Sequence, residues 1–345
     1  MMAKITFNDG TIIEDYETTY VIAEVNSSHN GSIEVAKQMI DAAKKAGCDC
    51  VKFQSWTTDT LYSKTYYDQN PIAKRFVDKL SLSADELAEV AQYCKSKKIG
   101  FSSTPYSKEE VDFLIEQDVP FVKISSMEIN NLEYLEYIGS KGVPIVLSTG
   151  MADEKEIERA VKIIHRTGNK NLALLHCVSI YPADVKTINL NNIIGLRKRY
   201  PECAIGFSDH TLGDAAAVAA TALGASIIEK HITLDSKKIG MDNQMAMEPD
   251  ELDILVQKCR NVRLALGSEL RTVLPEEYEQ RKKMRRSIIA TRDLKVGHII
   301  ERSDLGAKRP GNGIPPDEIQ TLIGRIVTVD IEKDTLIKSD SIKRP

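Results

Sequence analysis

The sequence predicts an α/β protein in which a (β/α)8 TIM barrel precedes a small C-terminal β-rich domain. Eight short apolar runs alternate with segments of helical periodicity, and eight strand–helix units over roughly 250 residues are the number that closes such a barrel. Two successive runs end in a histidine, and the pattern changes after residue 270. An open doubly wound sheet is the alternative, although no G-x-G-x-x-G follows the first strand to indicate a dinucleotide fold.

Strand-like and helical segments follow one another in a regular order. The predicted strands are 19–25, 49–54, 99–103, 120–125, 144–148, 172–177, 202–207 and 225–230. Apolar residues at helical spacing predict helices that include 33–46, 84–97, 108–117, 153–167 and 213–222. Residues 1–18 precede the first of these units, and with Asn8-Asp9-Gly10 as a turn they predict a β-hairpin across the bottom of the barrel.

The domain organisation is predicted from a change in composition. The barrel domain extends over 1–270, and the charged stretch 271–286 is predicted to be a linker. Residues 287–345 form a compact domain in which the phrases at 293–300 and 330–337 repeat one strand–turn–strand pattern. A domain of this size is too small to hold a large active site alone.

Composition excludes several functional classes. The formal net charge of −4 gives no reason to expect nucleic acid as a partner, and no apolar run reaches the ~20 residues of a membrane span. The N-terminus lacks the apolar core of a secretory signal, and six cysteines show no paired spacing. We therefore expect a cytoplasmic protein with reduced thiols, in which the C-D-C at 48–50 is only a weak metal-binding signal.

Polar side chains gather at the predicted strand ends. These residues are Glu24, Lys52, Gln54, Ser103, Thr104, Lys123, Ser126, Glu128, Ser148, Thr149, His176, Tyr181, Ser208, Asp209, His210, Glu229 and His231. Catalytic groups of barrel enzymes lie at the C-terminal ends of the strands. A set this polar indicates an active site for a polar, anionic ligand.

Two lysines follow apolar residues in V-K-F-Q and V-K-I-S-S. Burying Lys52 or Lys123 in a barrel mouth is costly without an anion. Both lysines, together with the hydroxyls of Ser126, Ser148 and Ser208, suit a phosphate and a carboxylate on one small molecule. The alternative is that each lysine pairs with a local glutamate.

His210 and His231 end two consecutive strands, so their imidazoles are predicted to lie side by side. Imidazole suits Mn, Fe, Zn or Co, and a site with two histidines leaves positions open for water and substrate. Hydrogen-bonded barrel histidines are the alternative. His176 either lines the site or only packs against its neighbours. Trp56 begins a predicted loop, 55–80, that is long enough to fold over the mouth of the barrel.

These phrases, in this order, resemble the N-acetylneuraminate (sialic acid) synthase family, which includes legionaminic and pseudaminic acid synthases. They are I-A-E-V-N-S-S-H-N-G (22–31), V-K-F-Q (51–54), S-S-T-P (102–105), V-K-I-S-S-M-E (122–128), V-L-S-T-G-M (146–151), L-L-H-C-V-S-I-Y-P (174–182), G-F-S-D-H-T (206–211) and E-K-H-I-T (229–233). K-R-P-G-N-G (308–313) resembles the SAF, or antifreeze-like, domain that ends these synthases. The resemblance covers nearly the whole chain.

The resemblance implies a transferase that condenses phosphoenolpyruvate with an N-acylated amino sugar such as N-acetylmannosamine. The products are a nine-carbon 2-keto-3-deoxy acid and phosphate. It implies a divalent ion, Mn²⁺ or Mg²⁺, on His210 and His231. The residues matching phosphoenolpyruvate contacts are Lys52, Lys123, Ser126, Ser148 and Ser208, with Thr104 and Gln54 nearby. Those matching positions near the sugar and the reacting carbons are Glu24, Glu128, Tyr181 and Asp242.

The resemblance also implies roles for Arg309 and for two glutamates. Arg309 matches an arginine that one subunit inserts into the barrel of its partner, so a domain-swapped homodimer is expected. A planar guanidinium would hold the sugar in a way that lysine does not reproduce. Glu24 and Glu128 are the candidates for proton handling.

Two motifs depart from the family pattern. The usual G-x-N-H is N-S-S-H here, with Asn26 and Ser28 at the changed positions. The usual G-P-D-H is G-M-D-N, which keeps Asp242 but has Met241 and Asn243. The condensation is expected to be retained, and the identity of the sugar stays open among neuraminate, legionaminate and other ulosonic acid synthases.

Two other functions remain. A Schiff-base aldolase would use Lys52 or Lys123 as its nucleophile. A non-catalytic sugar-binding protein would use the C-terminal domain for recognition. The joint presence of Lys52, Lys123, Glu128, His210, His231 and Arg309 counts against the binding protein.

Overall fold

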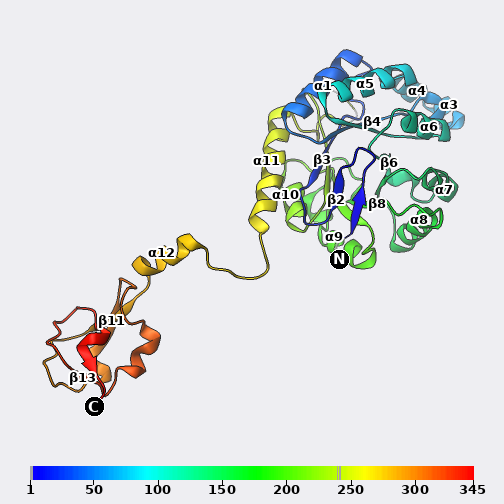
Figure 1. Cartoon of the computed structure of the whole chain (residues 1–345). Helices are drawn as coiled ribbons and strands as arrows, with labels where there is room; N and C mark the ends of the chain where they lie inside the picture. The colour runs from blue at the N-terminus through cyan, green and yellow to red at the C-terminus, as the bar shows by residue number, and fades with distance from the viewer. Residues whose placement is uncertain (1–2, 239, 241) are drawn as a thin grey trace. The chain divides into compact units, whose positions relative to one another are not determined.

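A computed structural model describes residues 3–238, 240 and 242–345, and it divides the chain into two compact units (Figure 1). The first unit is Met1–Gly267 and the second is Ser268–Pro345. None of the helices in the described ranges has the length and apolar character needed to cross a membrane.

The first unit is built on a ring of eight parallel strands. They are β3 (Tyr20–Glu24), β4 (Cys50–Gln54), β5 (Gly100–Thr104), β6 (Val122–Ile124), β7 (Ile145–Ser148), β8 (Leu172–Cys177), β9 (Ala204–Asp209) and β10 (Ile227–His231). Their order is β5-β4-β3-β10-β9-β8-β7-β6. Strands that follow one another in sequence are therefore neighbours, and β3 pairs with β10, which excludes the open doubly wound sheet.

The ring is nearly closed between β5 and β6. In the described part of the chain no backbone ladder joins these two strands. Ser102 Oγ on β5 instead donates a hydrogen bond of 2.8 Å to the carbonyl of Phe121, which immediately precedes β6. The predicted TIM barrel is confirmed, with a side-chain bridge at its last seam.

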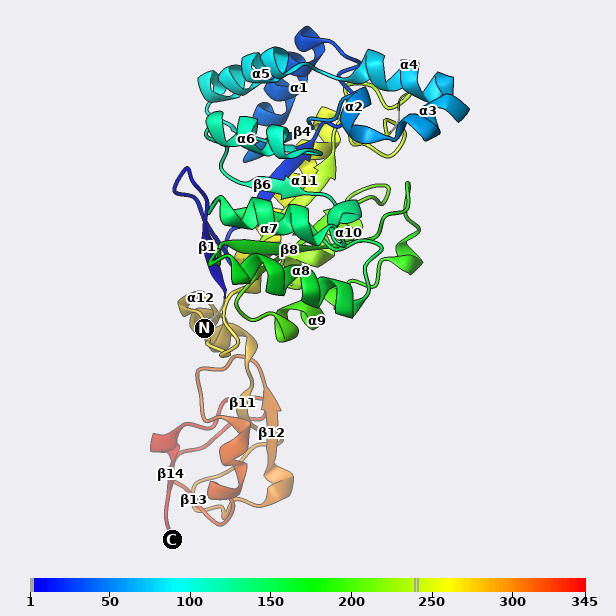
Figure 2. The ribbon, with the colours of Figure 1, turned by 90° about the vertical axis from the view of Figure 1, so that its right-hand side faces the viewer.

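Helices surround the strands (Figure 2). The main ones are α1 (Ile33–Lys45), α5 (Ala84–Lys97), α6 (Lys108–Glu116), α7 (Leu132–Ser140), α8 (Glu154–Arg166), α9 (Asn191–Arg199), α10 (Ala215–Ala222) and α11 (Pro249–Leu266). On α1 the buried residues Ala36, Met39, Ile40 and Ala43 form one face, as the helical repeat requires. This face joins the main core between the strands and the helices.

A second core fills the lower half of the barrel interior. Strands β1 (Lys4–Thr6) and β2 (Ile12–Glu14) form an antiparallel hairpin. Its Ile5, Phe7 and Ile13 pack with residues near the strand starts, including Phe121, whose ring centroid is 4.6 Å from that of Phe7. Apolar side chains thus plug the bottom of the barrel, and its polar side chains lie toward the C-terminal ends of the strands.

The segment 55–80, predicted as a long loop, folds into three short helices. These are α2 (Thr58–Leu61), α3 (Lys64–Gln69) and α4 (Pro71–Leu80). Trp56, Tyr67, Val77 and Leu80 form a small core of their own. Trp56 and Tyr67 therefore serve packing, whereas the other aromatic residues of this segment, Tyr62, Tyr66 and Phe76, are exposed.

The second unit begins with a helix and continues as short antiparallel strands. Helix α12 (Pro275–Met284) lies in the stretch predicted as a linker. Strand β11 (Ser287–Ala290) pairs with β12 (Leu305–Lys308), and β13 (Ile326–Val327) with β14 (Ile342–Lys343). The two repeated phrases pair with each other through Leu294 and Ile331, which exchange backbone hydrogen bonds of 2.8 and 2.9 Å.

Candidate active site

A cavity of about 420 Å³ lies at the C-terminal ends of the barrel strands. Its lining includes most of the residues predicted from the sequence: Glu24, Lys52, Gln54, Thr104, Lys123, Ser126, Ser148, Tyr181, Ser208, His210, His231 and Asp242. Asn26, Tyr106, Ser125, Met127, Met151, Cys177, Ser179 and Glu229 complete it. The strand ends thus bring side chains from distant parts of the sequence into one polar pocket.

The alternation of side chains along β10 places two functional groups in this cavity. Glu229 and His231 are two residues apart, so both face the barrel interior. Lys230 points to the other side, where its Nζ donates to Asp209 Oδ2 at 2.8 Å in a fully buried ion pair. Because Asp209 directly precedes His210, this pair fixes the end of β9 from outside the barrel.

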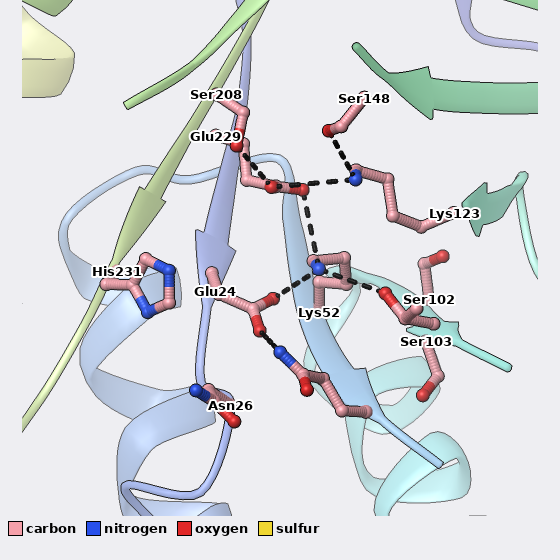
Figure 3. A network of polar contacts seen from close by, with 12 residues as sticks. Glu24, Asn26, Lys52, Ser102, Ser103, Lys123, Ser148, Ser208, Glu229 and His231 are labelled. Carbon is pink, nitrogen blue, oxygen red and sulfur yellow. Dashed lines mark hydrogen bonds and ion pairs between the residues drawn. The ribbon is translucent and has the colours of Figure 1, made fainter. Parts of the chain in front are cut away.

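Four charged residues form a buried network in the cavity (Figure 3). Lys52 Nζ lies 2.8 Å from Glu24 Oε2 and 3.6 Å from Glu229 Oε2. Lys123 Nζ lies 3.8 Å from Glu229 Oε1. Both lysines therefore have carboxylate partners and also face the cavity. Pairing with a local glutamate, which the sequence offered as an alternative, is thus compatible with contact between these lysines and an anionic ligand.

Hydroxyl groups surround this network. Lys52 Nζ donates to Thr104 Oγ1 at 3.1 Å, and Lys123 Nζ donates to Ser148 Oγ at 2.7 Å. Ser208 Oγ donates to Glu229 Oε1 at 2.8 Å. Hydroxyls and lysines of this kind can turn from their protein partners to an arriving anion.

The two glutamates differ in protonation. Burial raises the pKa of Glu24 to about 7, with Lys52 opposing the rise and Glu229 adding to it. Burial would also raise the pKa of Glu229, but Lys123, Lys52 and the hydrogen bond from Ser208 outweigh it and lower the pKa to about 2. Glu229 is therefore the permanent anion between the lysines, whereas Glu24 can gain and lose a proton near neutral pH.

The lysines differ as well. Burial lowers the pKa of Lys123, which Glu229 only partly offsets. For Lys52 the two carboxylates of Glu229 and Glu24 outweigh burial, and its pKa is raised.

Gln54 is held by two aromatic side chains. The indole Nε1 of Trp56 and the hydroxyl of Tyr106 each donate to Gln54 Oε1 at 2.9 Å. Gln54 Nε2 in turn donates to Glu24 Oε1 at 2.9 Å. Side chains that follow β4 and β5 thereby hold Gln54, which orients the carboxyl group of Glu24.

The two predicted imidazoles lie side by side. The ring centroids of His210 and His231 are 5.5 Å apart. His210 Nδ1 lies 2.8 Å from the carbonyl of Val178, and a hydrogen bond there leaves Nε2 with its lone pair. His231 Nδ1 is buried without a hydrogen-bond partner among the described residues, 3.7 Å from Asp242 Oδ2.

Five of the predicted residues that the structure describes in the barrel unit are absent from this lining: Ser103, Glu128, Thr149, His176 and Asp209. Glu128 is half-buried and accepts a hydrogen bond of 2.8 Å from Asn131 Nδ2, and it is absent from the lining among the described residues. Arg309 is exposed in the second unit, directly after β12. Met241 lies outside the described residues.

Glu229 belongs to the centre of the site, although sequence reasoning gave it no role. The signal that points to it is the alternation of side chains along β10. Residues two positions apart on a strand face the same side, so if His231 faces the barrel interior, Glu229 does as well. His176 is buried, and its Nε2 lies 2.6 Å from the carbonyl of Ile188. It lines a separate cavity of about 390 Å³.

The described residues contain one group of three possible metal ligands, and it lies elsewhere. His165, Glu202 and Cys203 bring their ligand atoms within 4.8 Å of one another. His165 belongs to α8 and the other two residues precede β9. This group contributes nothing to the lining of the active-site cavity.

Comparison with known proteins identifies the family. The family model described as the NeuB family matches residues 39–271, and the SAF domain model matches residues 285–343. The chain belongs to the NeuB family. The resemblance seen in the sequence is thereby confirmed, together with the SAF domain at the C-terminus.

Relatives of this NeuB-family protein match along nearly their whole length. The N,N'-diacetyllegionaminic acid synthase of Campylobacter jejuni is 37% identical over 93% of this chain and 99% of its own. The human N-acetylneuraminate-9-phosphate synthase is 35% identical over 94% of this chain and 92% of its own. The crystal structure of the N-acetylneuraminic acid synthetase of Leptospira borgpetersenii is 33% identical, with a TM-score of 0.74 over 81% of this chain and 95% of that chain.

Proposed function

We propose that this NeuB-family protein condenses phosphoenolpyruvate, an N-acylated amino sugar and water into a nine-carbon 2-keto-3-deoxy acid and phosphate. The supporting relatives are named as synthases of legionaminic, neuraminic and pseudaminic acids. N-acetylmannosamine or a diacetamido sugar is the proposed acceptor. The observation that carries the proposal is the pair Lys52 and Lys123 with Glu229 between them, beside two imidazoles in one cavity.

The lysine pair supports the binding of phosphoenolpyruvate. Lys52 and Lys123 are almost fully buried, and cations in such a place bind a phosphate or a carboxylate strongly. Ser148 and Thr104 already accept hydrogen bonds from these lysines and supply hydroxyls for the same anion. Glu229 lies between the two ammonium groups and offsets part of the cost of burying their charge before the substrate arrives.

The reaction forms one C–C bond and breaks one C–O bond. C3 of the enol attacks the aldehyde carbon of the sugar, and the aldehyde oxygen takes up a proton. Water adds to C2 with loss of a proton and forms a new C–O bond. The C2–O bond to phosphate then breaks, and the proton of the C2 hydroxyl passes to the departing phosphate, which leaves the C2 ketone. Glu24 is the proposed group for these protons, since its carboxyl lies beside Lys52 and its pKa is near neutral. A role for Glu128 would require it to turn from Asn131 toward the cavity.

The donor atoms beside the cavity fit a divalent cation. His231 Nδ1 is a buried nitrogen without a described partner, and the Nε2 of His210 keeps its lone pair, so these two side chains would hold Mn²⁺ or Mg²⁺. The ion would supply Lewis acidity for the aldehyde oxygen of the sugar. Tyr181, whose ring centroid is 4.3 Å from that of His210, would limit how far that imidazole turns.

A domain-swapped homodimer is the proposed assembly. Large apolar side chains are exposed on loops that follow the barrel strands: Met127, Met151, Ile180, Tyr181, Val185 and Leu212. A second copy would cover them and would bring its Arg309 to the sugar. All six cysteines are unpaired and buried, which supports a reducing, cytoplasmic location.

Phosphate release tests the proposal directly. The purified protein, with Mn²⁺, is incubated with phosphoenolpyruvate and one acceptor at a time, including N-acetylmannosamine and a 2,4-diacetamido-6-deoxyhexose. We expect release of phosphate that depends on the acceptor, together with a keto acid product of matching amount. A protein that binds these sugars stoichiometrically without phosphate release would be a sugar-binding protein.

A further inference from the structure

The turn that carries Asp242 is held by side chains from the segment after β3. Asn26 Nδ2 donates a hydrogen bond to Asp242 Oδ2. Ser28 Oγ donates to Asn243 Oδ1 at 2.7 Å. These bonds join the loop after the first barrel strand to the loop after the last one.

Three of the four side chains in these two contacts are buried. Asn26, Ser28 and Asn243 are 6%, 7% and 2% exposed, so solvent competes little for their hydrogen bonds. Asn243 also packs against the start of the turn, since a Cβ at Gly240 would lie only 2.7 Å from Asn243 Cγ.

Asn26 adopts a backbone conformation that few side chains tolerate. Its φ is +46°, in the left-handed region, where glycine is favoured and asparagine is among the few alternatives. Glycine would satisfy the backbone equally well and would lack the amide that binds Asp242. The side chain of Asn26 therefore has a use beyond the turn itself.

Asp242 faces the cavity and lies beside a proposed metal-binding imidazole. Its Oδ2 is 3.7 Å from His231 Nδ1 while it accepts from Asn26. A carboxylate has lone pairs on both oxygens, so Asp242 can accept a further hydrogen bond from a ligand. That ligand must carry a hydroxyl or amide N–H, because an ionised phosphoenolpyruvate has no donor and would be repelled.

The geometry points to Asn26, Ser28 and Asn243 as positioning residues that set the affinity for the acceptor sugar. They hold Asp242 in one orientation, in which it accepts a hydrogen bond from a hydroxyl or acylamino group of the sugar. They act on the acceptor and leave phosphoenolpyruvate binding unchanged. This inference rests on the proposed function.

Steady-state kinetics of Asn26→Gly, with each substrate varied in turn, test the inference. Glycine fits the backbone, so the fold is retained and only the hydrogen bond to a charged group is lost. We expect the KM for the sugar to rise about tenfold or more, with the KM for phosphoenolpyruvate unchanged. Ser28→Ala should raise the KM for the sugar by about threefold, because its hydrogen bond is between neutral groups.

Ser27→Ala is the matched control. Ser27 is equally buried in the same segment, and its hydroxyl makes no hydrogen bond to a described residue. Its two KM values should stay at those of the wild type. Equal rises of both KM values in Asn26→Gly, or no rise of the KM for the sugar, would overturn the inference.

Hydrogen exchange gives a readout that needs no turnover. Backbone amides of 242–247 should exchange faster in Asn26→Gly and Ser28→Ala than in Ser27→Ala, because the turn loses a bond that holds it. Unchanged exchange in both variants would show that these side chains do not hold the turn. Failure of the wild type to release phosphate would instead overturn the proposed function and, with it, the assignment to a sugar.

Discussion

Lys52 Nζ and Glu24 Oε2 lie 2.8 Å apart on the neighbouring strands β4 and β3, where both side chains are almost fully buried. A buried pair of this kind is stable only while the charges balance. When an anion binds Lys52, the pair weakens and a proton on Glu24 becomes favourable. Substrate binding and the protonation of Glu24 are therefore linked in this site.

Replacing either lysine should impair phosphoenolpyruvate binding. For Lys52→Met and Lys123→Met we expect kcat/KM for phosphoenolpyruvate to fall by at least about 100-fold, as when a buried charged hydrogen-bond partner is removed. Steady-state assays measure this. Lys170→Met, at an exposed lysine, is the control and should behave as the wild type. Full activity of Lys52→Met would remove the main support for the proposed function.

Borohydride distinguishes the synthase from a Schiff-base aldolase. The lowered pKa of Lys123, caused by burial, is the feature that an aldolase would use. We expect no pyruvate adduct on Lys52 or Lys123 after reduction, as judged by mass spectrometry. An adduct, together with activity that survives a chelator, would select the aldolase.

The pKa of Glu24 predicts how stability depends on pH. It is raised by burial to about 7 from an ordinary value of 4.5, so between these pH values the folded protein binds a proton that the unfolded chain has released. The free energy of unfolding should therefore fall as pH rises through this window, with a slope of up to about 1.4 kcal/mol per pH unit. Glu24→Gln should remove this fall. Urea unfolding followed by the fluorescence of Trp56, the single tryptophan, reports on the barrel unit alone.

Removal of the metal should abolish activity reversibly. A chelator should stop phosphate release, and Mn²⁺ should restore it. We expect His231→Ala to lose all measurable turnover and to unfold at the same urea concentration as the wild type. His165→Ala is the control, since this histidine belongs to the separate cluster with Glu202 and Cys203. If His165→Ala lost activity instead, the functional metal would have to be assigned to that cluster.

Arg309→Ala should weaken the use of the sugar more than that of phosphoenolpyruvate. If Arg309 acts in the barrel of the partner, mixing Arg309→Ala subunits with inactive His231→Ala subunits should raise the activity at low sugar concentration above that of either variant alone. Random exchange makes one functional site in each mixed dimer, or roughly a quarter of all sites. No recovery after verified subunit exchange would mean that Arg309 does not act across the dimer.

Much of the barrel could be predicted from the sequence because its signals are local. Apolar runs, helical periodicity and turn residues depend on neighbours within a few positions, and all eight strands begin and end within two residues of the predicted bounds. The site residues at the strand ends could be predicted because the C-terminal ends of all barrel strands meet on one face of the barrel. The three helices of 58–80 could not be predicted from the sequence, because tertiary packing around Trp56 and Tyr67 stabilises them.

By itself, the sequence determined the order of the strands along the chain and the chemical types that meet at their ends. The tertiary structure decided the closure by β3 and β10, the place of Glu229 between two lysines, and the turning of Glu128 toward Asn131. It also decided the bond between Asn26 and Asp242, which lie 216 positions apart. Such contacts depend on the direction of each side chain after the ring has formed, and no local pattern in the chain encodes that direction.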